Sequence, residues 1–494
     1  MADFFLGIDA GTTLIKTVLF DERGRSVATA KMEHDIQLLP DGGAELDLEL
    51  YWERIVACVR AMMKSTSVSS TDVRSLAASA HGVTVGFLDS AGRHIRRGFT
   101  YLDARGSEEA AELTAFLGKE RIFEHMGQPR LLPMLILPKI LWLKRHEPDS
   151  FRRIHKIVLV DDFLMYKLTG CWVSDPSLTG TTGFVRLQDG RLWEESLEYV
   201  GIQAEQLCPV RGSGTPVGKL QRNVAADLGL SEQTLVVCGT LDQAAGCLGS
   251  GNITEGTVTE STGTVLAVSA TVQKPLIDPE RPVPCFAHAL PGKFIMLPWC
   301  LGGGRVLKWF RDELSGGVSY DEMTAAAAEV SAGSDGLLIL PHLAGANSPE
   351  FNERARGVFF GIDFRHTRAH FARSIMESVG YMLRRNVELL RSLGLDIKTV
   401  CAIGGGARSR LWNQIKADIL QVPVSICESE EVAALGAAIL AAVGYGFFPT
   451  IEAGCRAFVR LSNTFQPNET SARTYEERYR KYRELYARLE TMFT

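Results

Sequence analysis

The sequence predicts an α/β protein built from two domains that share one architecture. The chain has 494 residues, whereas a single hydrophobic core stops growing at about 250–300 residues. A strand that runs into a glycine- and threonine-containing turn occurs near residue 10 and again near residue 260. Internal similarity of this kind is typical of a duplicated architecture.

The first part of the chain predicts an antiparallel meander followed by a helix. Short apolar runs bounded by glycine and charged turns predict strands at residues 4–9, 16–20 and 26–31. The apolar side chains of Leu48–Lys64 recur on one helical face. A buried strand is expected at 75–79, directly before Ala80-His81-Gly82.

The second part repeats the strand and turn and then alternates strands with long helices. A strand that runs into a Gly/Thr turn is expected at 258–264, further strands at 265–268, 337–340 and 399–403, and helices at 369–393 and 411–420. From about Ser471, tyrosines and leucines at helical spacing predict an amphipathic helix that packs on the body.

Composition and charge exclude several classes of protein. Hydrophobic residues make up 46% and charged residues 22% of the chain, which is ordinary for a globular protein. The net charge of −5 argues against a nucleic-acid binder, because phosphate backbones are bound by basic surfaces. The ten cysteines form no C-x-x-C pair, so neither a zinc site nor a redox pair is predicted.

Two stretches bear on localisation. The N-terminus enters a strand without the charged and apolar regions of a signal peptide. The longest uncharged stretch, 432–451, is rich in alanine and glycine and contains a proline. It falls short of the ~20 strongly apolar residues of a membrane span, so we expect a helix packed against a sheet. A cytoplasmic protein without a membrane partner is expected.

The two glycine-threonine turns are candidates for binding phosphate. Turns of this kind form concavities of backbone N–H groups that suit anions. One such turn could equally be an ordinary hairpin, whereas two in matching contexts favour phosphate. The residues concerned are Gly11, Thr12 and Thr13 in the first turn and Thr262, Gly263 and Thr264 in the second.

Two aspartates follow strands and could serve phosphoryl transfer, which needs a metal and a base besides phosphate donors. Asp9 is placed to hold Mg²⁺, which uses one or two carboxylates together with water and phosphates; a turn-capping role is the alternative. Asp242 follows an apolar strand and begins a small-residue run that reads as a helix start. A base there could deprotonate a hydroxyl, although an N-cap aspartate would look the same.

Further candidates concern the nucleotide and the acceptor. Gly404-Gly405-Gly406 precedes a helix containing Asn413, and consecutive glycines would let an adenine approach the backbone. His81 at a strand end could bind substrate or be a satisfied structural histidine. Asp103 and Arg105 would share one face of a strand, where they could bind sugar hydroxyls or form a surface pair of little weight.

Taken in order, these motifs resemble the FGGY family of carbohydrate kinases over essentially the whole chain. The matching segments are Gly7-Ile-Asp-Ala-Gly-Thr-Thr, Ala80-His-Gly, Pro138-Lys-Ile-Leu-Trp-Leu-Lys-Arg-His, Gly239-Thr-Leu-Asp-Gln, Ser261-Thr-Gly-Thr, Gly357-Val-Phe-Phe-Gly-Ile, 370–377 and 404–418. The resemblance implies two RNase H-like domains, of the actin, hexokinase and Hsp70 type, around a deep cleft. We expect a sugar-binding domain at 1–250, a nucleotide-binding domain at 251–445 and a helical segment at 446–494.

The resemblance also implies roles for single residues. It makes Asp242 the catalytic base and places Asp9 near Mg²⁺. The residues expected to bind the sugar or polyol are His81, Gly82, Asp103, Arg105, Asp242 and Gln243. Those expected to bind ATP are Gly11, Thr12, Thr13, Lys16, Thr262, Gly263, Thr264, Gly405, Gly406, Ala407 and Asn413. Family members are often dimers, so a homodimer stays open.

Within the family the motifs are most similar to those of xylulose kinases, and D-xylulose is the expected substrate. Three segments depart from the xylulose kinase pattern, all on the expected sugar side: Ser79-Ala80, Tyr101-Leu-Asp-Ala-Arg and Thr240-Leu-Asp-Gln243. A kinase for another polyol or sugar acid is therefore the alternative, with ribulose, erythritol, erythrulose, glycerol, gluconate and fuculose open. A chaperone-like or non-catalytic ATP-binding protein is a remote alternative.

Overall fold

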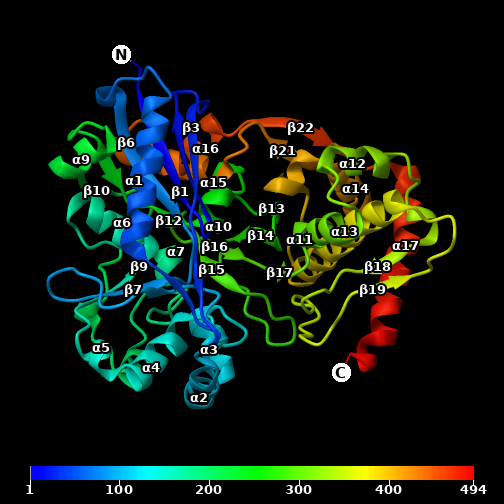
Figure 1. The fold of residues 1–494 in the computed structure, drawn as a ribbon, viewed down its shortest axis with the longest axis horizontal. Coiled ribbons are helices and arrows are strands. Elements are labelled where there is room, and N and C mark those ends of the chain that lie inside the picture. The colour runs from blue at the N-terminus through cyan, green and yellow to red at the C-terminus, as the bar shows by residue number, and fades with distance from the viewer. Residues whose placement is uncertain (1, 494) are drawn as a thin grey trace.

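A seven-stranded mixed sheet forms the centre of the first lobe in the computed structural model, which describes residues 2–493 (Figure 1). β1 (Phe4–Ala10), β2 (Leu14–Phe20) and β3 (Ser26–Glu33) form the expected antiparallel meander. β6 (Val73–Ala80) lies parallel to β1, and β11 (Leu235–Val237) and β12 (Thr240–Leu241) lie parallel to β6. β10 (Pro216–Lys219) closes this edge of the sheet.

The eight-stranded sheet of the second lobe repeats this arrangement. β13 (Thr257–Thr262) and β14 (Leu266–Val272) form the hairpin, and β20 (Thr399–Ile403) and β21 (Val424–Cys427) extend it in parallel from β13. In each lobe, a hairpin strand that enters a glycine-threonine turn is thus followed by two parallel strands. The repeated motif at residues 10 and 260 therefore marks a true structural repeat, and the fold is the expected pair of RNase H-like lobes.

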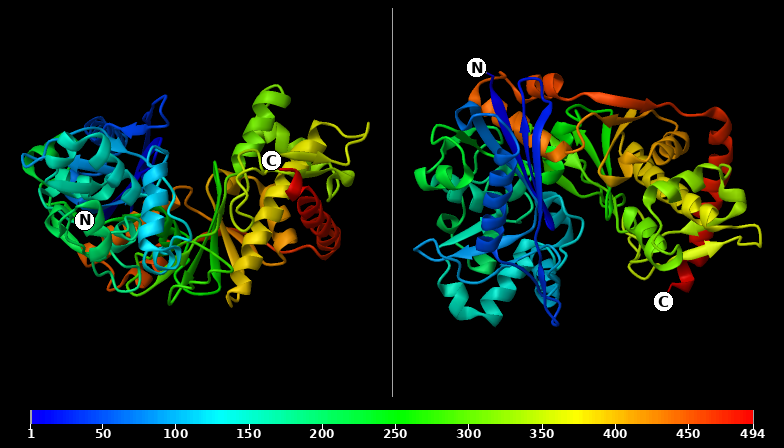
Figure 2. Two further views of the ribbon diagram at one scale, coloured as in Figure 1. Left: turned by 90° about the horizontal axis from the view of Figure 1, so that it is seen from below. Right: turned by 45° about the horizontal axis from the view of Figure 1, so that its top comes forward.

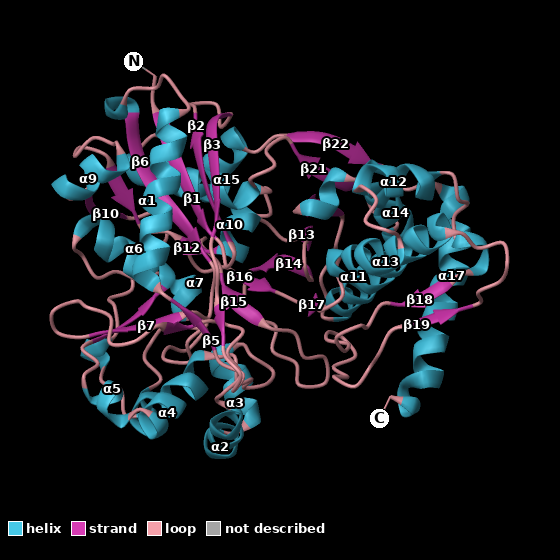
Figure 3. Ribbon diagram, viewed as in Figure 1, coloured by secondary structure: helices cyan, strands magenta, loops and turns pink. Residues whose placement is uncertain are grey.

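The remaining elements complete the eight-stranded sheet or surround the two sheets (Figure 3). The first lobe adds β4 (Gln37–Leu38), β5 (Ala44–Leu46), β7 (Val85–Leu88), β8 (Gly98–Phe99), β9 (Lys156–Leu159), α1 (Leu48–Lys64), α2 (Ser107–Leu117), α3 (Lys119–Met126), α4 (Ile136–His146), α5 (Pro148–Arg152), α6 (Val160–Thr169), α7 (Pro176–Thr179), α8 (Glu194–Val200) and α9 (Arg222–Leu228). The second adds β15 (Cys285–Ala287), β16 (Phe294–Met296), β17 (Trp299–Cys300), β18 (Leu338–Leu340), β19 (Val358–Phe360), β22 (Leu461–Phe465), α11 (Gly304–Trp309), α12 (Tyr320–Ala328), α13 (Arg368–Ser392), α14 (Arg410–Leu420) and α17 (Glu469–Leu489).

Local chemistry explains where two of the helices form. The Asp47 carboxylate accepts the N–H of Leu50 at 3.1 Å and so caps the start of α1. The four tyrosines of α17 at helical spacing are all buried against the second lobe: Tyr475, Tyr479, Tyr482 and Tyr486. No helix within residues 2–493 is long and apolar enough to cross a membrane.

Two helices join the lobes, which meet along one side of the molecule (Figure 2). α10 (Asp242–Gly249) packs against α15 (Val432–Tyr445) so closely that a Cβ on Gly249 would lie 1.9 Å from the Val432 carbonyl oxygen. A Cβ on Gly436 would lie 2.0 Å from the carbonyl oxygen of Ala245. Only glycine permits such backbone contact.

α15 and α16 (Ile451–Phe458) follow the second sheet in the chain but bury their apolar side chains in the core of the first lobe. Most of the uncharged stretch 432–451, residues 432–445, is therefore the expected helix packed against a sheet, on β1 and β6. The domain boundaries at residues 250 and 445 stay a prediction.

Candidate active site

Three residues singled out in the sequence lie at one edge of the first sheet. β1, β6 and β12 run parallel, with Ala10 opposite Ala80 and Ala80 opposite Leu241. Because the carboxyl ends of parallel strands meet at the same edge, Asp9, His81 and Asp242 come together although they are far apart in the chain.

Asp242 is the first residue of α10, and the residue in the N-cap position is Leu241. The Asp242 carboxylate accepts the N–H of Gln243 at 2.7 Å. Burial, reinforced by the negative charge of Asp9, raises its pKa from 3.8 to about 7. A carboxylate with a pKa near neutrality is matched to accepting a proton from a hydroxyl.

Asp9 is held by two polar neighbours. Ser79 donates its hydroxyl to Asp9 Oδ1 at 3.3 Å, and Lys16 Nζ lies 3.6 Å from Asp9 Oδ2. Burial raises the pKa of Asp9 although Lys16 opposes the shift. Lys16 also pairs with Glu431 at 2.8 Å. Its ammonium thus lies between two carboxylates, and ATP binding by Lys16 stays a prediction.

The Asp9 and Asp242 pair suits a divalent cation chemically, because a cation would relieve the repulsion between the two carboxylates. Within the described residues, no three or more His, Cys, Asp or Glu side chains gather into a cation site. Mg²⁺ needs only one or two protein carboxylates when water and phosphates complete its shell, and Asp9 is the residue that would supply one.

His81 presents one ring nitrogen to the site. Nδ1 lies 2.9 Å from the carbonyl oxygen of Ala10, so it carries the proton and donates it. Burial lowers the pKa of His81 from 6.5 to about 4, which keeps the ring neutral. The buried Nε2 has no hydrogen-bond partner within residues 2–493 and is free to accept a hydroxyl hydrogen.

Sequence reasoning missed two rings beside His81. Tyr51 donates its hydroxyl to the Gly11 carbonyl oxygen at 2.9 Å, and His34 Nε2 lies 3.1 Å from the same oxygen. Tyr51 meets both histidine rings edge-on. Both contacts are made to the Gly11 carbonyl oxygen, so they fix the backbone of the first glycine-threonine turn. Helical periodicity identified Tyr51 only as a core residue, and nothing local in the sequence distinguishes His34.

The placement of Asp103 and Arg105 differs from the expectation. They lie in the turn between β8 and α2, not in a strand. The Arg105 guanidinium donates to Asp103 at 2.6 Å and to Glu45 at 2.8 Å, and Asp103 also accepts the N–H of Ala44 at 2.9 Å. The pair is neither strand-borne nor a loose surface pair. Its hydrogen bonds are made within the protein, and sugar binding by these residues stays a prediction.

Gly82 and Gln243 flank the site. A Cβ on Gly82 would lie 2.7 Å from Leu241 Cδ1, so the His81–Gly82 turn packs directly on the residue before Asp242. Gln243 is half-buried in the first turn of α10. Leu241 and Gln243 are among the departures from the xylulose kinase pattern, and both lie at this edge of the sheet.

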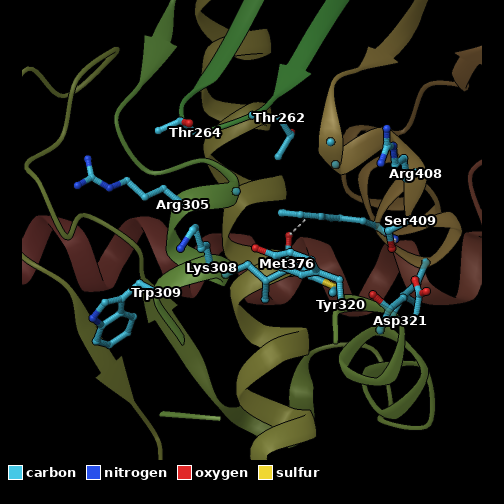
Figure 4. A pocket seen from close by; sticks show the side chains of 18 of the residues that line it. Thr262, Thr264, Arg305, Lys308, Trp309, Tyr320, Asp321, Met376, Arg408 and Ser409 are labelled. Atoms are coloured by element: carbon cyan, nitrogen blue, oxygen red, sulfur yellow. Dashed lines mark hydrogen bonds between the residues drawn. The ribbon is translucent and has the colours of Figure 1, made fainter. Parts of the chain in front are cut away.

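A pocket of about 1260 Å³ opens in the second lobe (Figure 4). Thr262 and Thr264 lie along one wall, and Tyr320 and Asp321 lie on the opposite side. Five of the residues expected to bind ATP line it: Thr262, Gly263, Thr264, Gly405 and Gly406.

Hydrogen bonds within the lobe fix the side chains of two expected ATP residues, one behind the wall of this pocket and one in the wall itself. The buried Asn413 donates its side-chain N–H to the Ala407 carbonyl oxygen at 2.7 Å and so holds the glycine loop. Thr262 donates its hydroxyl to Glu260, which pairs with Lys416 in the core. The Thr262 side chain is therefore already engaged within the lobe.

Sequence reasoning missed the opposite wall, formed by α11 and α12. The signal was present as a second glycine run, Gly302-Gly303-Gly304. The N–H of Gly304 donates to the Gly263 carbonyl oxygen at 2.7 Å, which ties the start of α11 to the second glycine-threonine turn. Arg305 and Lys308 of α11 are thereby brought to the pocket.

The duplicated lobes and this arrangement define a two-lobed α/β phosphotransferase, and comparison with known proteins agrees. The model of the FGGY family of carbohydrate kinases matches with its N-terminal domain at residues 4–249 and its C-terminal domain at 259–445. The protein belongs to this family. It is a carbohydrate kinase that transfers a phosphoryl group to a sugar hydroxyl.

Three similar proteins illustrate the range of the family. Xylulose kinase of Staphylococcus epidermidis is 30% identical over 483 residues, covering 97% of this chain and 96% of its own. Autoinducer-2 kinase of an Enterobacter species is 29% identical, covering 98% and 94%. The crystal structure of xylulose kinase from Rhodospirillum rubrum superposes with a TM-score of 0.88 at 29% identity, covering 99% of each chain.

Proposed function

We propose that the enzyme transfers the γ-phosphoryl group of ATP to the 5-hydroxyl of D-xylulose, with Asp242 as the general base. The observation that carries the base role is the position of Asp242: a half-buried carboxylate at a helix start, beside Asp9 and His81, with a pKa near neutrality. The substrate is inferred from the similarity to xylulose kinases. ATP and sugar phosphates are handled in the cytoplasm, which is the location we propose.

In the proposed reaction, the substrate hydroxyl donates its hydrogen to Asp242 and attacks the γ-phosphorus. The new P–O bond forms as the bond from the γ-phosphorus to the β,γ-bridging oxygen breaks, so that ADP leaves and the hydroxyl proton passes to the carboxylate. His81 Nε2 accepts a hydrogen bond from another hydroxyl of the sugar and so orients it. The glycine-threonine turns hold the phosphates through their backbone N–H groups. Mg²⁺, when bound near Asp9, would neutralise charge on the phosphates.

A kinase for another polyol is the second candidate, and one observation favours it. Leu241 and Gln243 depart from the usual xylulose kinase pattern on either side of the proposed base, and Leu241 packs on Gly82. A relative of similar identity carries the name autoinducer-2 kinase, so the family likeness alone permits more than one acceptor.

The substrate is tested by measuring ADP release with D-xylulose, D-ribulose, L-fuculose, erythritol, D-erythrulose, glycerol and gluconate at equal concentrations. We expect the highest kcat/KM for D-xylulose, and phosphorus NMR of the product should place the phosphate on O5. The sugar-free reaction serves as the background. A kcat/KM at least tenfold higher for another acceptor would replace D-xylulose while leaving the kinase class intact.

A further inference from the structure

The segment Pro138-Lys139-Ile-Leu-Trp142 at the start of α4 has no part in the reaction described above. We propose that Lys139 is a positioning residue, whose buried amine ties the His81–Val83 turn to the Thr100–Arg105 turn and so sets the shape of the sugar site. This inference rests on the proposed function, because it takes the His81 turn to contact the sugar.

The contacts of Lys139 are unusual for a lysine. Its side chain is 1% exposed, and Nζ donates to the Val83 carbonyl oxygen at 3.0 Å and to the Thr100 carbonyl oxygen at 2.7 Å. Lysine is rarely buried unless it is paired, yet no carboxylate of residues 2–493 lies within ion-pair distance of Nζ. The amine therefore donates its hydrogen bonds to two backbone carbonyl oxygens, one from each of two different segments of the chain.

The first of these carbonyls belongs to a strained residue. Val83 has φ of +63°, a conformation that is an outlier for a β-branched side chain. Such strain persists only where surrounding contacts hold it, and it gathers at functional sites. Val83 follows His81 and Gly82 directly, so the bond from Lys139 fixes the exit of the turn that presents His81 Nε2.

The second carbonyl begins the turn that carries Asp103 and Arg105. Thr100 accepts the N–H of Asp103 at 3.1 Å with the same carbonyl that Lys139 contacts. Two further contacts from α4 reach this turn. A Cβ on Gly106 would lie 3.1 Å from the Pro138 backbone, and the Arg105 guanidinium lies 4.5 Å from the centre of the Trp142 ring.

The link does not depend on the charge of Lys139. Burial lowers its pKa from 10.5 to about 7, with Asp103 opposing and Arg105 reinforcing the shift. A neutral amine still has two N–H donors for the two carbonyls. α4 therefore supports both sugar-side turns at once, through Pro138, Lys139 and Trp142.

The test compares Lys139→Met, which keeps length but removes the donors, with Lys144→Met on the same helix. Lys144 is half-exposed and donates only to the Tyr199 carbonyl oxygen at 3.4 Å. We expect Lys139→Met to raise the sugar KM at least about tenfold, because it removes two hydrogen bonds from a group that can be charged. The ATP affinity measured by calorimetry should stay unchanged, and amide hydrogen exchange should become faster at 81–84 and 100–105.

Two further variants serve as controls. Lys139→Arg should have a sugar KM between those of the unchanged enzyme and Lys139→Met, and Lys144→Met should alter neither the sugar KM, the ATP affinity nor the amide exchange.

The outcomes separate the two proposals. Unchanged exchange in both turns would overturn the link through Lys139. Faster exchange with an unchanged sugar KM would keep the link but overturn the placement of the sugar, and with it the proposed site. If Lys139→Met does not fold, Val83→Gly supplies the test, because glycine adopts φ of +63° without strain. The double variant Val83→Gly/Lys139→Met should fold and should have a higher sugar KM than Val83→Gly alone. A sugar KM within twofold of that of Val83→Gly would refute the inference.

Discussion

Asp242 shows how burial can prepare a carboxylate for catalysis. The sequence places an aspartate at a helix start, where an N-cap role would be the ordinary explanation. In the structure Leu241 holds the N-cap position, and the Asp242 carboxylate accepts the N–H of the next residue, Gln243. Its raised pKa arises first from burial and then from Asp9. An ordinary structural aspartate gains nothing from such a shift, whereas a base does.

The pH dependence of the reaction follows from this shift. A base must be deprotonated, so kcat/KM for the sugar should rise about tenfold per pH unit below pH 7 and level off above about pH 8. Asp242→Asn should lower kcat by a factor of roughly 10² or more. The kcat/KM that remains should no longer rise with pH between about pH 6 and 8. Burial also lowers the pKa of Lys139 to about 7. If kcat/KM of Asp242→Asn still rose with pH, the titrating group would be one other than Asp242.

Single residues were predictable where they end a strand. Asp9, His81 and Asp242 each follow an apolar run whose end can be read from the sequence, and parallel pairing then brings them to one edge. The groups that support this edge from elsewhere in the fold, His34 at the Gly11 carbonyl oxygen and Glu431 at Lys16, were not predictable. His34 and Glu431 depend on strand register and on the return of the chain to the first lobe, which local patterns do not encode.

The glycine loop after β20 shows that neighbouring glycines have different physical reasons to be glycine. A Cβ on Gly405 would meet nothing within 4 Å, whereas a Cβ on Gly406 would lie 2.7 Å from Thr262 Cβ. Both glycines line the pocket, but an added Cβ would enter open space at Gly405 and would collide with Thr262 at Gly406. Only Gly405 therefore has room for a side chain.

Substitution by alanine should separate these two roles. Gly405→Ala should fold with an unchanged melting temperature but raise the KM for ATP several-fold, because its methyl group enters the pocket. Gly406→Ala should lower the melting temperature, because Thr262 is buried and hydrogen-bonded to Glu260 and cannot move aside at low cost. A Gly405→Ala enzyme with an unchanged ATP KM would remove this loop from the nucleotide site.

At the level of elements, periodicity located α1 at Leu48–Lys64 and β20 at Thr399–Ile403 with the bounds that the structure has. The strand prediction failed for Asp103 and Arg105, which lie in a turn between the two-residue strand β8 and the helix α2. Their two-residue spacing fits one face of a strand, whereas the turn at Thr100–Gly106 is held by Lys139 and Trp142 from a distant helix. Local spacing cannot reveal such support.

At the level of the whole molecule, the contact between α10 and α15 joins the two lobes and carries Asp242 at one end. Gly249 and Gly436 allow the two helices to touch backbone to backbone. Any side chain at these positions must push the helices apart, and the base at the start of α10 would move with them.

Two substitutions in α10 test this. Gly249→Ala should destabilise the protein by at least about 1–3 kcal/mol, because its methyl group would meet the Val432 carbonyl oxygen. Gly246→Ala lies one turn earlier, where a Cβ would make an ordinary contact of 3.5 Å with Ile403 Cδ1. Because alanine favours helix by about 1 kcal/mol over glycine, Gly246→Ala should not lower the melting temperature. Equal melting temperatures for the two variants would contradict the role assigned to the close contact.

The same helices also bear on how the chain is made. The core of the first lobe includes side chains of α15 and α16, which begin at Val432. On a ribosome that adds about 5–20 residues per second, roughly 10–40 s pass between the emergence of α10 and that of α15. During that interval the apolar face of β1 and β6 that α15 covers in the folded protein is exposed to solvent. Nascent chains should therefore depend on a holding chaperone in this window, and a fragment that ends near residue 250 should be prone to aggregate.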